Sequence, residues 1–436
     1  MDRGRNGRSA VTRTPQEGRD GQRAPRARQR ALCLGISSDE GALDELRELL
    51  LTAGVVTVGE LVQERTEPHP NTYLGSGKVA EAKALAAALD ANLIACDDEL
   101  SARQERNLEL AVGLPVVDRT TVILDIFATH AGSAEGKLQV ELAQLEYNLA
   151  RMRGLWSHLE RLGGGIGTRG PGETQIETDR RLARNRIATL RRRLERVRGT
   201  RAMQRAERER AALPTIALVG YTNAGKSSLL NALTGADAGV RDRLFHTLDP
   251  TVRTLSIAGR RYLLTDTVGF ISKLPHQLVD AFGATLEETR RAQLVAHVLD
   301  ASASLDQQEA MRRAVEETLE EIGAGEQPRL LVLSKADLLD AAARSELRLR
   351  FPAAVLVSAQ TGEGLDELSE TIERELAHTL RHVELLVPYA DGGRLAELHR
   401  VAGELTRRDT PDGVRVRALL PARLAERFAR YAVASP

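Results

Sequence analysis

The chain has 436 residues, of which 28% are charged, and its 61 basic and 61 acidic side chains balance to a formal net charge of zero. This length predicts about three domains. Two cysteines, Cys33 and Cys96, are too few for a disulfide framework or a cysteine-rich metal site. Because the chain has no apolar run of membrane-spanning length and no secretory signal, we expect a soluble, cytoplasmic protein.

Residues 1–30 carry nine arginines among glycine, proline, glutamine and threonine, with little apolar surface to bury. This composition predicts a disordered basic tail. The tail is either a solvated segment or an RNA contact, because attraction to phosphate requires only charge.

Residues 31–134 alternate between short apolar runs and amphipathic stretches. The runs at 31–36, 55–62, 92–96 and 115–117 predict strands, and the stretches at 39–51, 79–89 and 101–111 predict helices. Strands that alternate with helices favour a small parallel α/β domain. The glycine turn at 72–78 contains a lysine but falls far short of a phosphate-binding motif, so we interpret it as structural.

Residues 135–212 predict an antiparallel helical hairpin with a glycine-rich loop at 163–172. Apolar residues recur at alternating spacings of four and three in both helices, which is a heptad seam. The loop also matches G-x-G-x-x-G, but it follows a helix rather than a strand, so we reject a dinucleotide site. The seam residues are Leu138, Leu142, Leu145, Leu149, Met152, Trp156 and Leu159, then Ala183, Ile187, Leu190, Leu194 and Val197.

The second helix of this hairpin is strongly basic. Thirteen arginines lie between Arg180 and Arg210, against three glutamates. A solvated helix face usually mixes charge signs, so this pattern favours nucleic-acid contact over solvation alone. Few aromatic residues interleave, and we therefore expect contact with backbone phosphate rather than base stacking.

Residues 213–380 are organised around a complete G-x-x-x-x-G-K-[ST] motif. An apolar run at 215–219 precedes it and a helical stretch follows, which is the order that a phosphate-binding loop requires. Backbone N–H groups and the helix N-terminus would face the phosphates, Lys226 would neutralise them, and the Ser227 hydroxyl would ligate Mg²⁺. The motif and the residue after it are Gly220, Tyr221, Thr222, Asn223, Ala224, Gly225, Lys226, Ser227 and Ser228.

Two later segments complete the γ-phosphate end of the predicted site. An apolar strand ends in Asp266, Thr267, Val268 and Gly269, so Asp266 would reach the Mg²⁺ shell and the Gly269 N–H would sense the γ-phosphate. One threonine of a switch loop would complete the metal shell. We favour Thr247, with Thr251 as the alternative. The predicted switch loop consists of Phe245, His246, Thr247, Leu248 and Asp249, followed by a proline.

This reading gives each group a role. The candidate catalytic residues are Lys226, Thr247 and Gly269. The candidate metal ligands are Ser227, Thr247 and Asp266.

The residues that follow two further apolar strands are predicted to bind the nucleotide base. Asp337 would accept hydrogen bonds from guanine N1–H and the exocyclic amine together, whereas adenine presents an acceptor at N1. Lys335 would lie along the base plane, and the turn after residue 357 would present a backbone N–H to the guanine carbonyl. The sequence therefore predicts a GTPase that binds GTP and GDP. The base-binding residues are Ser334, Lys335, Ala336, Asp337, Ser358, Ala359 and Gln360.

Residues 381–436 predict a small α+β domain. The expected order is strand at 383–387, helix at 392–405, strand at 414–420 and helix at 421–431. No motif in this segment carries chemistry.

These motifs resemble those of the translation-factor class of GTPases, and specifically the HflX family. Segments 135–143 and 170–181 resemble that family's hairpin and loop signatures, and segments 245–251 and 268–276 resemble its two switches. The resemblance covers nearly the whole chain after the tail. It implies a ribosome-associated GTPase that binds the large subunit, splits stalled or idle ribosomes and is linked to heat stress and hibernation. It also implies that the hairpin reaches ribosomal RNA near the peptidyl-transferase centre.

Two positions depart from the family pattern. Ser334 stands where the family usually has asparagine, so we expect one supporting hydrogen bond to be lost and nucleotide affinity to fall by about 1 kcal/mol. The segment 130–134 is less basic than expected.

Two further positions bear on the rate of hydrolysis. Phe270 occupies the place where Ras-like GTPases carry a water-orienting glutamine, so we expect slow hydrolysis by the free protein. Asn223 resembles the asparagine that holds K⁺ in potassium-dependent relatives; the alternative is that it bonds only within its loop.

We therefore expect a monomeric cytoplasmic GTPase whose nucleotide state times ribosome dissociation, with peripheral membrane association left open. One alternative is an RNA-binding module that keeps a regulatory GTP site. Another is a ribosome-assembly GTPase that acts on precursors.

Overall fold

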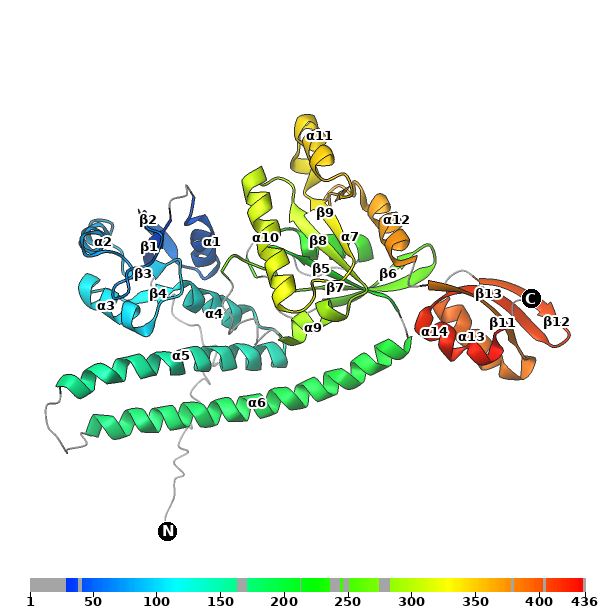
Figure 1. Ribbon diagram of the computed structural model, residues 1–436, viewed down its shortest axis with the longest axis horizontal. Helices are drawn as coiled ribbons and strands as arrows, with labels where there is room; N and C mark the ends of the chain where they lie inside the picture. The colour runs from blue at the N-terminus through cyan, green and yellow to red at the C-terminus, as the bar shows by residue number, and fades with distance from the viewer. Residues whose placement is uncertain are drawn as a thin grey trace, which may run out of the picture.

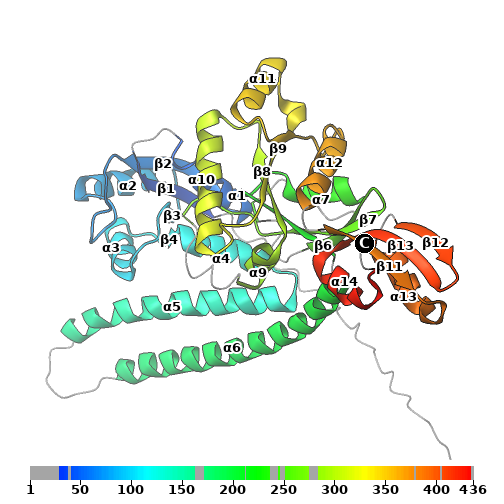
Figure 2. The same ribbon diagram turned by 45° about the vertical axis from the view of Figure 1, so that its right-hand side comes forward.

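The computed structural model describes residues 29–37, 41–162, 171–211, 213–235, 244–245, 251–273, 283–377, 380–402 and 405–433. Three β-sheets and a long helical hairpin make up this part of the chain (Figure 1). The two larger sheets lie side by side, and the hairpin runs along one side of both (Figures 1 and 2). The third sheet lies at the end opposite the N-terminal sheet.

The N-terminal sheet has four parallel strands in the order β2-β1-β3-β4. The predicted parallel α/β arrangement is confirmed, and the central strands β1 and β3 are almost wholly buried, as expected when helices cover both faces. The elements are β1 Arg30–Ile36, α1 Asp44–Thr52, β2 Val56–Gln63, α2 Ser76–Ala88, β3 Leu93–Cys96, α3 Ala102–Val112, β4 Val116–Asp118 and α4 Arg119–His130.

Helix α4 is absent from the sequence prediction. It follows β4 directly and lies between the N-terminal sheet and the central sheet (Figure 1). Neighbouring positions such as Ile123, Leu124 and Ile126 are all buried, and the exposed face is confined to Asp125, Ala128 and Thr129. A helix that is buried over most of its circumference has only a weak amphipathic period for a sequence pattern to reveal.

The predicted hairpin is confirmed and consists of α5 Ala134–Leu162 and α6 Pro171–Ala211. On α6 the seam residues Ala183, Ile187, Leu190 and Leu194 are buried against α5. Helix α5 has a second apolar line of Val140, Ala143 and Tyr147, which packs into the same core cluster as α4. The side chains of Met152, Trp156 and Leu159 lie outside those that the structure describes.

The central sheet has six strands in the order β10-β9-β8-β5-β7-β6. Only β6 at the edge runs antiparallel to its neighbour, which fits the predicted mostly parallel, doubly wound fold. The elements are β5 Thr215–Gly220, α7 Lys226–Thr234, β6 Thr251–Ile257, β7 Arg260–Asp266, α9 Gly283–Arg291, β8 Leu294–Asp300, α10 Leu305–Glu321, β9 Arg329–Ser334, α11 Ala341–Arg350, β10 Val355–Leu356 and α12 Leu365–Leu376.

The C-terminal sheet has three antiparallel strands in the order β11-β13-β12. The α+β class is confirmed, but the predicted helix at 392–405 is wrong at its end, because α13 stops at Val401 and Leu405 begins a strand. That strand is an edge strand with mostly exposed, charged residues, so it lacks the apolar alternation of a half-buried strand. The elements are β11 Leu380–Val387, α13 Gly392–Val401, β12 Leu405–Thr410, β13 Gly413–Pro421 and α14 Ala422–Arg427.

Candidate active site

The phosphate-binding loop connects the central strand β5 to α7, as the motif predicts. Gly220 has a φ of 154°, and a Cβ there would lie 2.2 Å from the carbonyl oxygen of Val298. Gly225 has a φ of 89° and precedes the first residue of α7. Both backbone conformations favour glycine, which explains why the loop carries glycine at these two positions.

Lys226 is buried at the base of this loop. Its Nζ donates to the carbonyl oxygens of Gly220, at 3.0 Å, and Tyr221, at 2.7 Å. Burial lowers the pKa of the Lys226 ammonium to about 8, and the nearby Asp266 carboxylate opposes that shift. Phosphate oxygens would add further negative charge and favour the charged form. The loop thus holds the lysine in place for a phosphate.

The proposed metal ligands Ser227 and Asp266 meet at the end of the adjacent strands β5 and β7. Ser227 Oγ donates to Asp266 Oδ2 at 2.6 Å, and the neighbouring Thr267 hydroxyl donates to the Leu218 carbonyl at 2.7 Å. A hydroxyl and a carboxylate are oxygen ligands of the kind that Mg²⁺ takes, so the pair fits this ion. A bound Mg²⁺ would neutralise charge on the transferring phosphate.

Among the residues that the structure describes, no group of three or more His, Cys, Asp or Glu side chains could hold a metal. Mg²⁺ is commonly bound through few protein groups, with phosphates and water completing its shell. Thr247 lies outside the described residues. Its alternative, Thr251, begins β6 and stands opposite Asp266 in the antiparallel register.

The segment 269–273, called the switch segment below, is attached to the phosphate-binding loop. The Thr222 N–H donates to the Phe270 carbonyl at 2.8 Å, and the Phe270 N–H donates to the Gly220 carbonyl at 3.1 Å. A Cβ at Gly269 would lie 2.8 Å from Thr222 Cγ2 and 3.1 Å from Lys226 Nζ. The Gly269 backbone therefore lies beside the lysine, where it was expected to sense the γ-phosphate.

A cavity of about 260 Å³ brings the loop together with the predicted base-binding residues. Sequence reasoning missed its apolar lining of Leu229, Leu338 and Val357, although each is a neighbour of a motif residue. The predicted residues that line it are Asn223, Gly225, Ser228, Ser334, Lys335, Asp337, Ala359 and Gln360.

Two contacts hold the base-binding side chains in this cavity. Ser358 Oγ donates to Asp337 Oδ1 at 2.6 Å, and Lys335 Nζ donates to Asp300 Oδ2 at 2.7 Å. Asp300 ends β8, the strand beside β9, and was not predicted. The one feature of the sequence that could have indicated it is a carboxylate at the end of a buried strand. The contact with Ser358 fixes the Asp337 carboxylate, so the second oxygen of that carboxylate is held in one orientation for the base.

Ser334 links the base-binding loop to the phosphate-binding loop. Its Oγ lies 2.7 Å from the Ala224 carbonyl and 3.0 Å from the Leu299 carbonyl. A hydroxyl has one proton, whereas an asparagine amide has two. Serine can therefore satisfy only one of the two carbonyls at a time, and the expected loss of one supporting hydrogen bond relative to asparagine stays a prediction.

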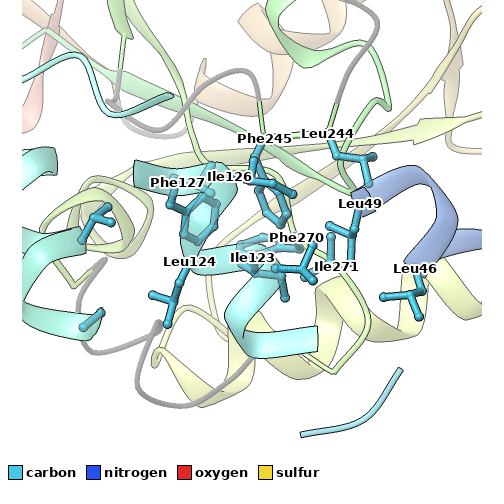
Figure 3. Close-up of a cluster of buried hydrophobic side chains, with 14 of the residues drawn as sticks. Leu46, Leu49, Ile123, Leu124, Ile126, Phe127, Leu244, Phe245, Phe270 and Ile271 are labelled. Atoms are coloured by element: carbon cyan, nitrogen blue, oxygen red, sulfur yellow. The ribbon is translucent and has the colours of Figure 1, made fainter. Parts of the chain in front are cut away.

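The remaining predicted residues divide into three groups. Ala224, Thr267, Val268, Ala336 and Ser358 are buried around the site. Phe245 is buried against α4, with its ring centroid 4.6 Å from that of Phe127 (Figure 3). His246, Leu248 and Asp249, like Thr247, lie outside the described residues.

The second candidate surface is the basic face of α6. Apart from the half-buried Arg180, its arginines are exposed where the structure describes their side chains, and Arg186 and Arg191 pair with α5. Arg186 lies 2.6 Å from Glu141, and Arg191 lies 2.8 Å from Glu146. The other exposed arginines of this face are Arg181, Arg184, Arg192, Arg193 and Arg196.

Three family models match the chain. One described as "GTP-binding GTPase N-terminal" matches residues 40–128, and one described as "GTP-binding GTPase Middle Region" matches residues 130–208. A third, described as "50S ribosome-binding GTPase", matches residues 215–335.

Individual proteins are similar over most of the chain. The GTPase HflX of Lacrimispora saccharolytica is 47% identical over 408 residues, covering 91% of this chain and 94% of that protein. The GTPase HflX of Escherichia coli strain K12 is 45% identical over 384 residues, covering 86% and 89%. A solved GTP-binding protein of Sulfolobus solfataricus in complex with GDP is 25% identical, with a TM-score of 0.41, covering 80% of this chain and 99% of that chain. Within the described residues, no helix has the length and apolar character to cross a membrane.

Proposed function

This chain belongs to the HflX family of GTPases, and from that premise we propose that it couples GTP binding and hydrolysis to the dissociation or rescue of stalled or idle ribosomes. As a GTP hydrolase of a ribosome-binding GTPase family, it needs a nucleotide site and a surface for RNA. The observation that supports the proposal best is the presence of both: a cavity that joins the phosphate-binding loop to the predicted guanine-binding residues, and a hairpin with a basic face. A ribosomal partner implies action in the cytoplasm, and we propose that the chain acts as a monomer.

In this proposal the large subunit is contacted through the arginines of α6. Their positive charge would neutralise phosphates of ribosomal RNA and release counterions. Helix α5 packs against α6 on one side and against α3 and α4 of the N-terminal domain on the other, so the hairpin is attached to that domain by packing. In this proposal, a displacement of the hairpin is transmitted to the nucleotide site.

At the nucleotide site, hydrolysis would rest on positioning and on electrostatic stabilisation of the transferring phosphoryl group. Lys226 would contact the β- and γ-phosphates, Ser227 and Asp266 would hold Mg²⁺, and Thr247 would complete that shell. The Gly269 N–H would contact the γ-phosphate. Phe270 cannot orient water, and its side chain is buried in the cluster that includes α4 (Figure 3).

The test is a sucrose-gradient assay on mature ribosomes incubated with the chain and GTP, a non-hydrolysable GTP analogue, or GDP. We expect separated subunits with GTP and with the analogue, and intact ribosomes with GDP. Intact ribosomes in all three conditions, with binding only to subunit precursors, would favour the ribosome-assembly alternative. Splitting to the same extent with GDP would favour an RNA-binding module whose GTP site is only regulatory.

We further propose that K⁺ bound beside Asn223 adds positive charge at the phosphates. Asn223 lines the nucleotide cavity and has a φ of 60°. Hydrolysis by the free chain should be slow and about tenfold faster in KCl than in NaCl, because a fixed cation stabilises developing charge. Multiple-turnover rates at equal ionic strength, with and without large subunits, measure the effect. The Asn223→Ala variant should lose the difference between the salts; equal wild-type rates in both salts would rule out the cation.

A further inference from the structure

The switch segment is held from outside its own domain by a buried arginine. Arg119, the first residue of α4, is 2% exposed. Its guanidinium donates to the Ser272 carbonyl at 3.0 Å and lies 3.1 Å from the Ser272 hydroxyl. Ser272 is three residues after Gly269, so a contact there restricts where the Gly269 backbone can lie.

The same guanidinium is fixed by two carboxylates of the N-terminal domain. Arg119 pairs with Asp97 at 2.7 Å and also donates to Glu45. Burial opposes its charge, but Glu45 and Asp97 together raise the pKa of Arg119. A planar guanidinium with five donors can serve these carboxylates and Ser272 together, which a lysine ammonium cannot do in one geometry.

Glu45 extends this contact to the phosphate-binding loop. The Tyr221 hydroxyl donates to Glu45, and the Ser272 N–H donates to the Tyr221 hydroxyl at 2.7 Å. Lys273 adds ion pairs to Asp97, at 3.0 Å, and Asp98, at 2.5 Å. Arg119, Glu45, Tyr221 and Ser272 therefore form one hydrogen-bonded group across the two domains.

Apolar packing surrounds this group. Phe270 and Ile271 of the switch segment lie in one cluster with Leu49 of α1 and Ile123 of α4 (Figure 3). This packing holds Ile271, which precedes Ser272, and the ion pairs hold Lys273, which follows it. The N-terminal domain therefore contacts both neighbours of Ser272.

Arg119 can hold Ser272 in place only if its own backbone is held in place. The preceding residue, Asp118, holds that backbone through its side-chain contacts. The Asp118 carboxylate accepts from the Thr121 N–H at 2.9 Å, which caps α4, and from Arg151 of α5 at 2.7 Å. Tyr147 of α5 donates to the same carboxylate. The start of α4 is therefore tied to the hairpin as well as to β4.

We propose that Arg119 is a positioning residue for GTP hydrolysis. From the N-terminal domain it fixes Ser272, and through Ser272 it keeps the Gly269 N–H beside Lys226, where both face the γ-phosphate. Within the central domain Arg119 itself donates to Ser272, and the base-binding cavity is lined by other residues, so Arg119 acts through the switch segment. GDP, which lacks the γ-phosphate, does not depend on it.

The test compares Arg119→Lys with the wild type as free full-length chains, so that neither measurement depends on ribosomes. We expect kcat for GTP to fall about tenfold, because a displacement of about 1 Å in a positioned group is enough for losses of this size. Affinity for a non-hydrolysable GTP analogue should fall with it, and affinity for GDP should stay within twofold. The control is Arg260→Lys, which alters the part-buried pair of Arg260 and Glu373 away from the switch segment.

A milder pair of variants keeps the proposal testable if Arg119→Lys does not fold. Ser272→Ala removes the hydroxyl and should lower kcat about threefold, and Ser272→Thr, which keeps a hydroxyl, should restore it. Equal losses of GDP and GTP-analogue affinity would show a merely structural role. Unchanged or faster hydrolysis in the Ser272→Ala variant would overturn the proposal.

Discussion

Replacing Asp337 with asparagine should move the chain from guanine to xanthine nucleotides. Guanine donates from N1–H and from its exocyclic amine, and one carboxylate accepts both. An amide presents a donor to the second of these, so one contact becomes repulsive. Xanthine has a carbonyl in place of the amine and accepts from that same amide. We expect GTP affinity to fall on the order of 100- to 1,000-fold, because each hydrogen bond to a charged group contributes about 1.5–3 kcal/mol.

Equilibrium binding of labelled GTP and XTP to the purified variant measures this exchange. Asp340→Asn is a matched control, because it makes the same chemical change three residues further along. Asp340 caps α11 through the Ala343 N–H at 2.8 Å and lies outside the cavity, and asparagine caps a helix as well as aspartate does. An Asp337→Asn chain that binds GTP at wild-type affinity and rejects XTP would show that the base is held elsewhere.

Neutralising Arg191, Arg192 and Arg193 on α6 should weaken binding to the large ribosomal subunit. If each contacts one phosphate, the slope of log affinity against log salt should fall by about two to three, and affinity at physiological salt by about 10- to 100-fold. Arg191 also pairs with Glu146, but an exposed ion pair contributes little to stability, about 0–1 kcal/mol, so the fold should survive. Sedimentation of the Arg→Gln triple variant with large subunits, over a series of salt concentrations, gives both quantities.

The control for this experiment removes the same charge from another surface. Arg313 on α10 and Arg348 and Arg350 on α11 are exposed, and α11 lies on the side of the central sheet away from the hairpin (Figures 1 and 2). Changing these three to glutamine should leave the salt slope unchanged. If the α6 variant also keeps the wild-type slope, the arginines of α6 form only a solvated face.

Much of the nucleotide site was predictable because its chemistry is local in the chain. A phosphate-binding loop requires glycines, a lysine and a hydroxyl within a few residues, and Gly220 and Gly225 occupy backbone conformations that favour glycine. The loop, the segment after Asp266 and the segment after Ser334 each follow an apolar strand, and parallel strands bring their carboxyl ends to one edge. Spacing and strand order were therefore enough to predict that Asn223, Asp337 and Gln360 share one cavity.

The hairpin was predictable for a similar reason, since a heptad seam is a repeat that can be read along one chain. The heptad seam did not predict how the hairpin attaches to the N-terminal domain. Tyr147 and Arg151 lie off the seam, and their contacts with Asp118 depend on where α4 and β4 happen to be placed. A seam identifies which helices pair, but it carries no information about a second face.

Only the tertiary structure decided which distant residues control the switch segment. Glu45 and Tyr221 are separated by 176 positions, and no sequence pattern that contains one of them predicts a contact with the other. Helix α4 escaped detection because burial over most of its circumference weakens its amphipathic period. Phe270 is chemically unable to orient water, which its side chain alone reveals, but its burial beside Ile123 required the folded chain. Motifs and periods are properties of short stretches, whereas a contact such as that between Arg119 and Ser272 exists only after two domains have packed together.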